Sequence, residues 1–449
     1  MPFTSEQALA LAPDSASASS GRKLANTRHW QSLGRNPEAL WGECQGSGKN
    51  PYQVRVDLAT LSVKCSCPSR KFPCKHGLGL MLIFAASTGD LVEGEPPDWV
   101  ADWLAKRHER AEKRAESPLS PGEAAAKAQA RAKDKARRAE KREKLVAQGI
   151  ESLSLWLDDL MRNGLAAIET APDDFWETQA ARMTDAQAPG IAGRLRALAA
   201  IPGSAPDWPD RLLDDLGRIA LLARAYSRLD ALDAPLREDV RHLVGWPYNT
   251  VDLETQGERI RDDWAVLGQW EEIQDRGQFQ YTWLRGHDTG RTALIAQFAL
   301  PGGPFPELLM PGVSQRGEMG FWPGANPQRA YLLARQGDVH SLTGPLPGAC
   351  AIEPFLASVA DALARQPWQE RFLAVLACVT LYYCGVAGAW RVRDETGAAL
   401  PLLPGDYWRL LAISGGHPLE VVGEWDGRAL RLLGALSEDV YYPLREEYQ

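Results

Sequence analysis

Three cysteines and a histidine crowd into residues 64–76, which read K-C-S-C-P-S-R-K-F-P-C-K-H. Cys65 and Cys67 form a C-x-C pair, and after six residues Cys74 and His76 follow as C-x-H. Three thiolates and one imidazole are a complete tetrahedral ligand set for zinc. Because four protein ligands leave no position for an activated water, the pattern predicts one structural zinc ion per chain.

Two alternatives compete with zinc. The C-x-C pair could be a redox dithiol, because neighbouring cysteines can exchange disulfides. That interpretation gives no role to Cys74 and His76 at ligand spacing, so we favour zinc. The other alternative is four ordinary buried side chains, which does not explain why the thiols cluster so closely.

The flanking residues predict the elements that would position these ligands. Tyr52, Val54 and Val56 alternate with polar residues, which is the period of a half-buried strand. Residues 61–64 would be its hairpin partner, and 78–86 predict a buried helix with Cys74 and His76 at its first turn. A short strand at 41–44 would precede the hairpin. A metal ion would then join hairpin to helix where apolar surface alone is too small to hold them.

This arrangement resembles the SWIM-type zinc finger. The segments C-S-C-P-S at 65–69 and P-C-K-H-G-L at 73–78 are similar to that family's consensus in ligands and flanks. The resemblance covers roughly residues 40–88, and it implies a ββα fold and a role in DNA or protein binding rather than a reaction. It also extends to bacterial SWIM proteins whose genes often neighbour a MoxR-type ATPase and a von Willebrand A-type protein, which implies a protein partner.

Four cations surround the ligands, namely Lys64, Arg70, Lys71 and Lys75. Three thiolates and Zn²⁺ leave one net negative charge, which nearby cations would offset. These residues are therefore candidate nucleic-acid contacts or a solvated, neutralising surface. We favour the surface, because no aromatic platform on which bases could stack accompanies them.

The chain as a whole predicts a multi-domain α+β protein, since 449 residues at about 100–200 per domain suggest two to four domains. The expected parts are a flexible N-terminal segment 1–39, a zinc module 40–105, a basic helical connector 106–145, a helical region 146–245, and a mixed α+β C-terminal domain 246–449.

The connector carries an unusual charge. Residues 106–144 hold 14 Lys plus Arg and 7 Asp plus Glu, a net of +7, within a chain whose formal net charge is −8. It has no apolar stripe, so we interpret it as a solvated helical spacer. The alternative is non-specific nucleic-acid binding through counterion release.

Hydrophobic periodicity predicts the remaining elements. Helices are expected at 173–184, 190–200, 208–232, 235–244, 353–366 and 368–383, and strands at 279–283, 292–300, 390–393, 408–413, 419–425 and 429–433. We interpret 312–317, His287, Asp288 and His417 as turn residues, and Cys378 and Cys384 as small core residues.

Composition narrows the function classes. The negative net charge excludes a protein that is basic throughout and coats nucleic acid. There is no apolar run of about 18–20 residues for a membrane span, and no secretory signal, and seven cysteines make no disulfide scaffold, so a cytoplasmic protein is expected. Three hypotheses remain: a zinc-binding adaptor for a protein partner, a nucleic-acid-binding factor, and an enzyme hidden in residues 246–449.

Overall fold

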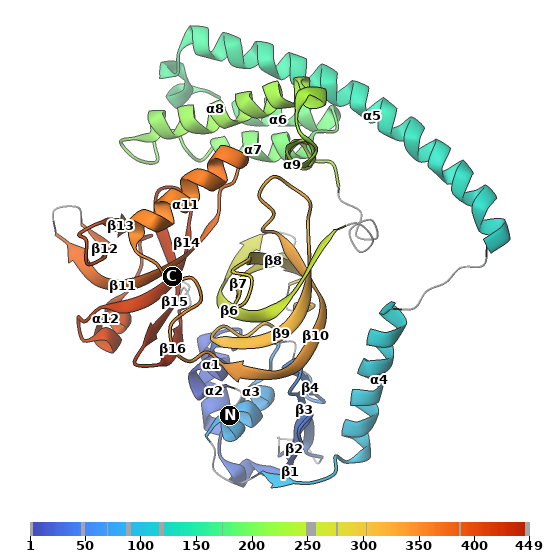
Figure 1. Cartoon of the computed structure of the whole chain (residues 1–449), viewed down its shortest axis with the longest axis vertical. Helices are drawn as coiled ribbons and strands as arrows, with labels where there is room; N and C mark the ends of the chain where they lie inside the picture. The colour runs from blue at the N-terminus through green and yellow to red at the C-terminus, as the bar shows by residue number, and fades with distance from the viewer. Residues whose placement is uncertain are drawn as a thin grey trace.

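The structure is a computed structural model (Figure 1). It describes residues 3–45, 50–69, 71–86, 91–115, 121–172, 174–247, 257–274, 277–301, 303–385 and 388–444. None of the helices in these ranges is both long and apolar enough to cross a membrane.

The zinc module is built on a sheet with the order β4-β3-β2-β1-β5, which we call the finger sheet. Neighbours from β1 to β4 are antiparallel, and β5 pairs parallel with β1. Its strands are β1 (Trp30–Arg35), β2 (Ala39–Cys44), β3 (Tyr52–Asp57), β4 (Ser62–Cys65) and β5 (Val92–Glu93). The predicted hairpin and the strand before it are confirmed.

Alternation along the strands gives the finger sheet two buried faces. Leu40, Val54 and Val56 point to one face, where α3 (Lys75–Ala85) packs. Ala39 and Trp41 point to the other, which is covered by α4 (Asp98–Ala115). The residues of α4 that pack on the sheet precede residue 106, and the helix continues to Ala115, so the boundary predicted between zinc module and connector falls inside α4.

The expectation of a flexible segment over residues 1–39 is wrong for most of it. Two helices, α1 (Ser5–Ala10) and α2 (Ser15–Leu24), precede β1. The second helix can pack closely on α3 because residue 21 is glycine. A Cβ at Gly21 would lie 2.8 Å from Leu78 Cβ. An Ala/Ser-rich segment with few large apolar residues is thus ordered by close packing on α3, a tertiary effect that local composition does not report.

The middle sheet has the order β10-β9-β6-β7-β8. It curls so that its outer strands approach each other, and Leu294 N donates to Gln328 O at 2.7 Å. The strands are β6 (Glu258–Gln274), β7 (Gly277–Gly286), β8 (Thr292–Ala299), β9 (Val313–Phe321) and β10 (Ala330–Ser341). Residues 313–317 were expected in a turn and instead begin β9.

The C-terminal sheet has the order β13-β12-β11-β14-β15-β16. Its elements are α11 (Ile352–Arg365), β11 (Phe372–Cys384), β12 (Ala389–Arg393), β13 (Ala399–Pro401), α12 (Trp408–Ser414), β14 (Leu419–Trp425), β15 (Leu430–Ser437) and β16 (Val440–Pro443). Two predictions are wrong here: the helix at 368–383 is a strand, and the strand at 408–413 is a helix. Cys378 is also exposed rather than a core residue.

Helices α5 to α9 form a bundle above the middle sheet and the C-terminal sheet (Figure 1). They are α5 (Pro121–Asn163), α6 (Phe175–Asp185), α7 (Pro189–Leu198), α8 (Trp208–Ser227) and α9 (Ala234–Val244). Periodicity located these helices well. The boundary drawn at residue 145 nevertheless falls inside α5, which carries the connector sequence into the bundle without a break.

The finger packs directly on the middle sheet, and we call this contact the finger joint. One continuous apolar cluster contains Leu61 and Phe84 from the finger together with Trp264 and Val313 from the middle sheet. Helix α1 fills the seam beside it, where Gln7 Nε2 donates to Gly312 O at 2.6 Å. The finger is thus joined to the domain that follows it by a shared core.

The bundle contacts the middle sheet and the C-terminal sheet in a different way, and we call this contact the bundle joint. Trp368 is buried in the bundle core, and its Nε1 donates to Arg218 O at 3.0 Å. Around it the contacts are polar: Asp239 accepts from Ala325 N at 2.7 Å, and Arg194 forms an ion pair with Glu370.

Candidate metal centre

The hairpin and α3 bring the four predicted ligands to one point. Cys65 ends β4, and the chain turns back as Ser66 N donates to Gln53 O at 3.0 Å. Cys74 is the N-cap residue of α3, and His76 lies in the first turn of that helix. Close approach of helix and hairpin depends on Gly77, where a Cβ would lie 2.4 Å from Val63 Cγ1.

The ligand atoms of Cys65, Cys67, Cys74 and His76 all lie within 4.8 Å of one another. His76 presents Nδ1 to the sulfurs, 3.8 Å from Cys65 Sγ and 4.0 Å from Cys74 Sγ. Zinc bonds of about 2.3 Å to sulfur and about 2.05 Å to nitrogen give tetrahedral edges of about 3.6 Å. The arrangement therefore fits a tetrahedral zinc ion after a small contraction.

Protonation of the thiols supports the same conclusion. The Cys65 thiol donates a hydrogen bond to Cys74, which lowers the pKa of Cys74, while that bond and burial raise the pKa of Cys65. Without an ion, the cluster thus favours one thiolate and opposes the next. A divalent cation removes this conflict, because coordinated thiols are deprotonated outright.

Cys44 is a separate case. It is fully buried and is not among the grouped ligands. Burial raises the pKa of its thiol to about 11, so it stays protonated at neutral pH. It is a packed free thiol.

The cations near the ligands differ in their surroundings. Lys64 and Lys75 have exposed side chains. Lys71 Nζ lies 2.6 Å from Asp14 Oδ2 and forms an ion pair with it, which lowers the pKa of the Asp14 carboxyl. Arg70 lies outside the residues that the structure describes. The predicted cationic surface is therefore partly neutralised by α2.

Helix α4 covers the opposite face of the finger sheet with two tryptophans. The Arg55 guanidinium carbon lies 5.1 Å from the Trp99 ring centre and 5.7 Å from that of Trp103. Arg107 binds the hairpin turn through Asp57 Oδ2 at 3.2 Å. The two tryptophans, four residues apart beside Val100 and Leu104, are an amphipathic signal in the sequence that our element assignment missed.

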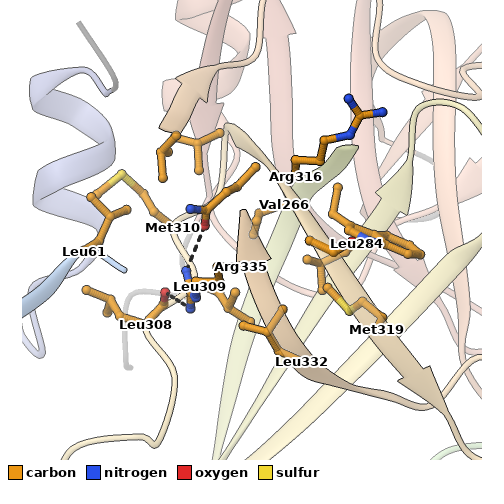
Figure 2. A pocket seen from close by; sticks show the side chains of 15 residues that line it. Leu61, Val266, Leu284, Leu308, Leu309, Met310, Arg316, Met319, Leu332 and Arg335 are labelled. Carbon is orange, nitrogen blue, oxygen red and sulfur yellow. Dashed lines mark hydrogen bonds between the residues drawn. The ribbon is translucent and has the colours of Figure 1, made fainter. Parts of the chain in front are cut away.

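A small cavity lies where the hairpin turn meets the middle sheet (Figure 2). Leu61 enters it from the finger, and the other lining residues are mostly apolar. Arg335 is buried there and donates to Gln315 Oε1 at 3.1 Å, Glu307 Oε2 at 3.2 Å and Leu308 O at 3.0 Å. The guanidinium thus links the loop at 307–308 to β9 at the finger joint. The sequence contained no local signal for this cluster.

Comparison with known proteins identifies two parts of the chain. Residues 52–83 match the family model of the SWIM zinc finger, and residues 141–244 match the model of the SWIM-associated four-helix bundle domain. The chain therefore carries a SWIM zinc finger followed by the bundle domain associated with it, and the resemblance drawn from the ligand spacing is confirmed. Neither the curated proteins nor the solved structures gave a match.

The matched finger and the converging ligands together imply zinc binding. In the matched bundle segment lie the last part of α5 and helices α6 to α9. The two matches leave the middle and C-terminal sheets unassigned to a family.

Proposed function

We propose that the protein is a non-enzymatic adaptor in which one structural zinc ion per chain stiffens the finger and the zinc loop, residues 66–69 and 71–73, contacts a protein partner. The observation that carries this proposal is the exposure of the Phe72 side chain. This residue lies in the loop between the second and third ligands, and 36% of its surface is exposed. Aromatic side chains held on a rigid support are typical anchors of protein interfaces.

The rest of the finger supports this choice of surface. One face of its sheet is buried by α3 and the other by α4, so neither sheet face is open to a partner. The loop residues Pro68 and Ser69 are exposed beside Phe72. A loop fixed by a metal and two prolines loses little entropy on binding.

The partner expected from the resemblance to bacterial SWIM proteins is a component of a MoxR-type ATPase system. This is the specific form of the proposal. The zinc loop would then be the adaptor's contact with the ATPase or with the protein that works beside it.

The test compares exposed phenylalanines in the full chain. Tagged wild-type protein, Phe72→Ala and Phe298→Ala are used to capture partners from native lysate, with and without nuclease. Phe298 is 43% exposed and lies on β8, so it is a matched control. We expect capture that resists nuclease, is lost in Phe72→Ala, and is retained in Phe298→Ala. Capture that nuclease abolishes, or that Phe72→Ala leaves unchanged, contradicts the proposal.

The second candidate function is nucleic-acid binding, which the exposed side chains of Lys64 and Lys75 favour. If phosphates were bound here, affinity for a labelled duplex would fall steeply with salt concentration. Lys75→Ala would then reduce the slope by about one ion, because each phosphate contact releases about one counterion. Salt-independent or undetectable binding would leave the adaptor as the function.

A further inference from the structure

We infer that Tyr52 is a positioning residue for the metal centre, and that it holds the His76 imidazole so that Nδ1 faces the sulfurs. The Tyr52 ring centre lies 5.0 Å from that of His76, with an angle of 46° between the ring planes. His76 itself is 5% exposed. This inference rests on the zinc site of the proposed function.

The imidazole needs such a support because its own torsion does not choose a direction. Rotation about the Cβ–Cγ bond of histidine has broad and roughly two-fold preferences. Half a turn would exchange Nδ1 for the carbon on the other side of the ring. The ligand set of three sulfurs and one nitrogen would then be incomplete, so whatever fixes the ring also sets the affinity for the ion.

Tyr52 is well placed for this role. It begins β3 and is held opposite Cys44 in the antiparallel pairing with β2. It lies on the same face of the strand as Val54, which is fully buried under α3. The sheet therefore fixes the tyrosine backbone, and the tyrosine ring lies against the imidazole. Hydrogen-bonded partners that orient a ligating histidine typically change metal affinity by about 10–100-fold when they are removed, and we take this range as the scale for a ring contact that does the same.

The experiment measures metal affinity and ligand geometry in the full chain. Wild type, Tyr52→Phe and Tyr52→Leu are titrated with zinc against a chelator. The same chains are then loaded with cadmium-113, and the coupling between the metal and the imidazole nitrogens is read by NMR. Phenylalanine keeps the ring, whereas leucine keeps apolar bulk without a flat face, so the pair separates ring contact from simple packing.

We expect Tyr52→Phe to bind zinc within about 2-fold of wild type with coupling to Nδ1, and Tyr52→Leu to bind about 10–100-fold more weakly with reduced coupling. Val54→Ala, which loosens the same hairpin but keeps Tyr52, should retain the Nδ1 coupling. Unchanged affinity in Tyr52→Leu would overturn the inference, as would an equal loss of Nδ1 coupling in Val54→Ala. A wild-type chain that bound no zinc would refute the metal site itself.

Discussion

The finger joint and the bundle joint attach two modules to the rest of the chain by different chemistry. At the finger joint, apolar side chains from both sides merge into one core, and the buried cation Arg335 has its partners within the joint. At the bundle joint, a single buried tryptophan, Trp368, is surrounded by hydrogen bonds and ion pairs. One joint resembles the interior of a domain, and the other resembles a contact between domains.

The difference teaches which module can act independently. Separating the finger would expose a continuous apolar surface to water, and that exposure costs a free energy of about 25 cal/mol for each Å² of apolar area. Separating the bundle would mainly exchange polar contacts for water, which costs far less. The finger should therefore behave as part of the middle sheet, and the bundle as a unit that can open, close or titrate.

The largest effect should come from the metal. Cys74→Ser removes one ligand, so we expect zinc to fall from one ion per chain to near zero, measured by elemental analysis. The free energy of unfolding should drop by several kcal/mol, because metal binding contributes directly to folding. Since the finger shares its core, hydrogen exchange should also rise in β9 (313–321).

Cys44→Ala is the matched control, because this cysteine is buried beside the cluster but is not among the grouped ligands. Zinc should be retained. Faster hydrogen exchange confined to residues 40–86 in Cys74→Ser would show that the two sides of the finger joint fold separately. That result would contradict the view that the finger and the middle sheet share one core.

The hairpin turn tests the apolar side of the finger joint without touching the metal. Leu61 is 1% exposed and has a φ of 53°. Leu61→Ala keeps a side chain at this strained φ, so the change isolates lost packing, and we expect a loss of about 2–5 kcal/mol in the free energy of unfolding. Zinc content should be unchanged. Leu155→Ala, at a leucine that is 63% exposed, should change stability by no more than about 0.5 kcal/mol.

The bundle joint should respond to pH through Asp239. Burial raises the pKa of its carboxyl from 3.8 to about 6, against the hydrogen bond from Ala325 N, and Asp233 and Glu238 add to the rise. The folded state then binds more protons than the unfolded state between those values, so stability falls as pH rises through this window and stays reduced above it.

Asp239→Asn removes this penalty while its amide oxygen still accepts from Ala325. We expect the variant to be more stable than wild type at neutral pH, by at most about 3 kcal/mol, and to lack the decline in stability as pH rises from about 4 to about 6. Urea unfolding across that range measures both. Parallel pH curves for the two chains would show that Asp239 titrates as an ordinary surface carboxyl.

The smallest effect should come from the rim of the bundle joint. Arg194→Ala breaks the ion pair with Glu370, whose side chain is 49% exposed. We expect a loss of about 0.2–1 kcal/mol that shrinks further in about 1 M salt, because exposed pairs are screened. A double-mutant cycle with Glu370→Ala isolates the pair. A coupling energy that did not change with salt concentration would show that the pair is shielded from solvent, which contradicts this description of the bundle joint.

The sequence was sufficient for the metal centre and the bundle because both are encoded locally. The ligands lie within twelve residues, from Cys65 to His76, and the bundle helices carry regular apolar stripes between prolines. The parts of the finger that depend on distant residues were not predicted. The pairing of Lys71 with Asp14 and the cover by Trp99 and Trp103 became visible only in the fold.

The wrong elements have physical reasons too. Strand β11 is inside its sheet and packs against apolar clusters on both faces, so its sequence is largely apolar and shows no alternation in its first half. Such a run cannot be told from a buried helix by period alone. Helix α12 is seven residues long, too short for its period to be distinct from that of a strand.

The finger joint also orders events during synthesis. The hairpin turn at Leu61 is made 278 residues before Val339, which lines the cavity that receives it. At about 5–20 residues per second, the nascent finger waits about 15–55 s for its neighbour. Throughout that interval its thiols are already present while one side of its core lacks a cover, so an ion captured early would protect the unfinished module until the strands that shelter it emerge from the ribosome.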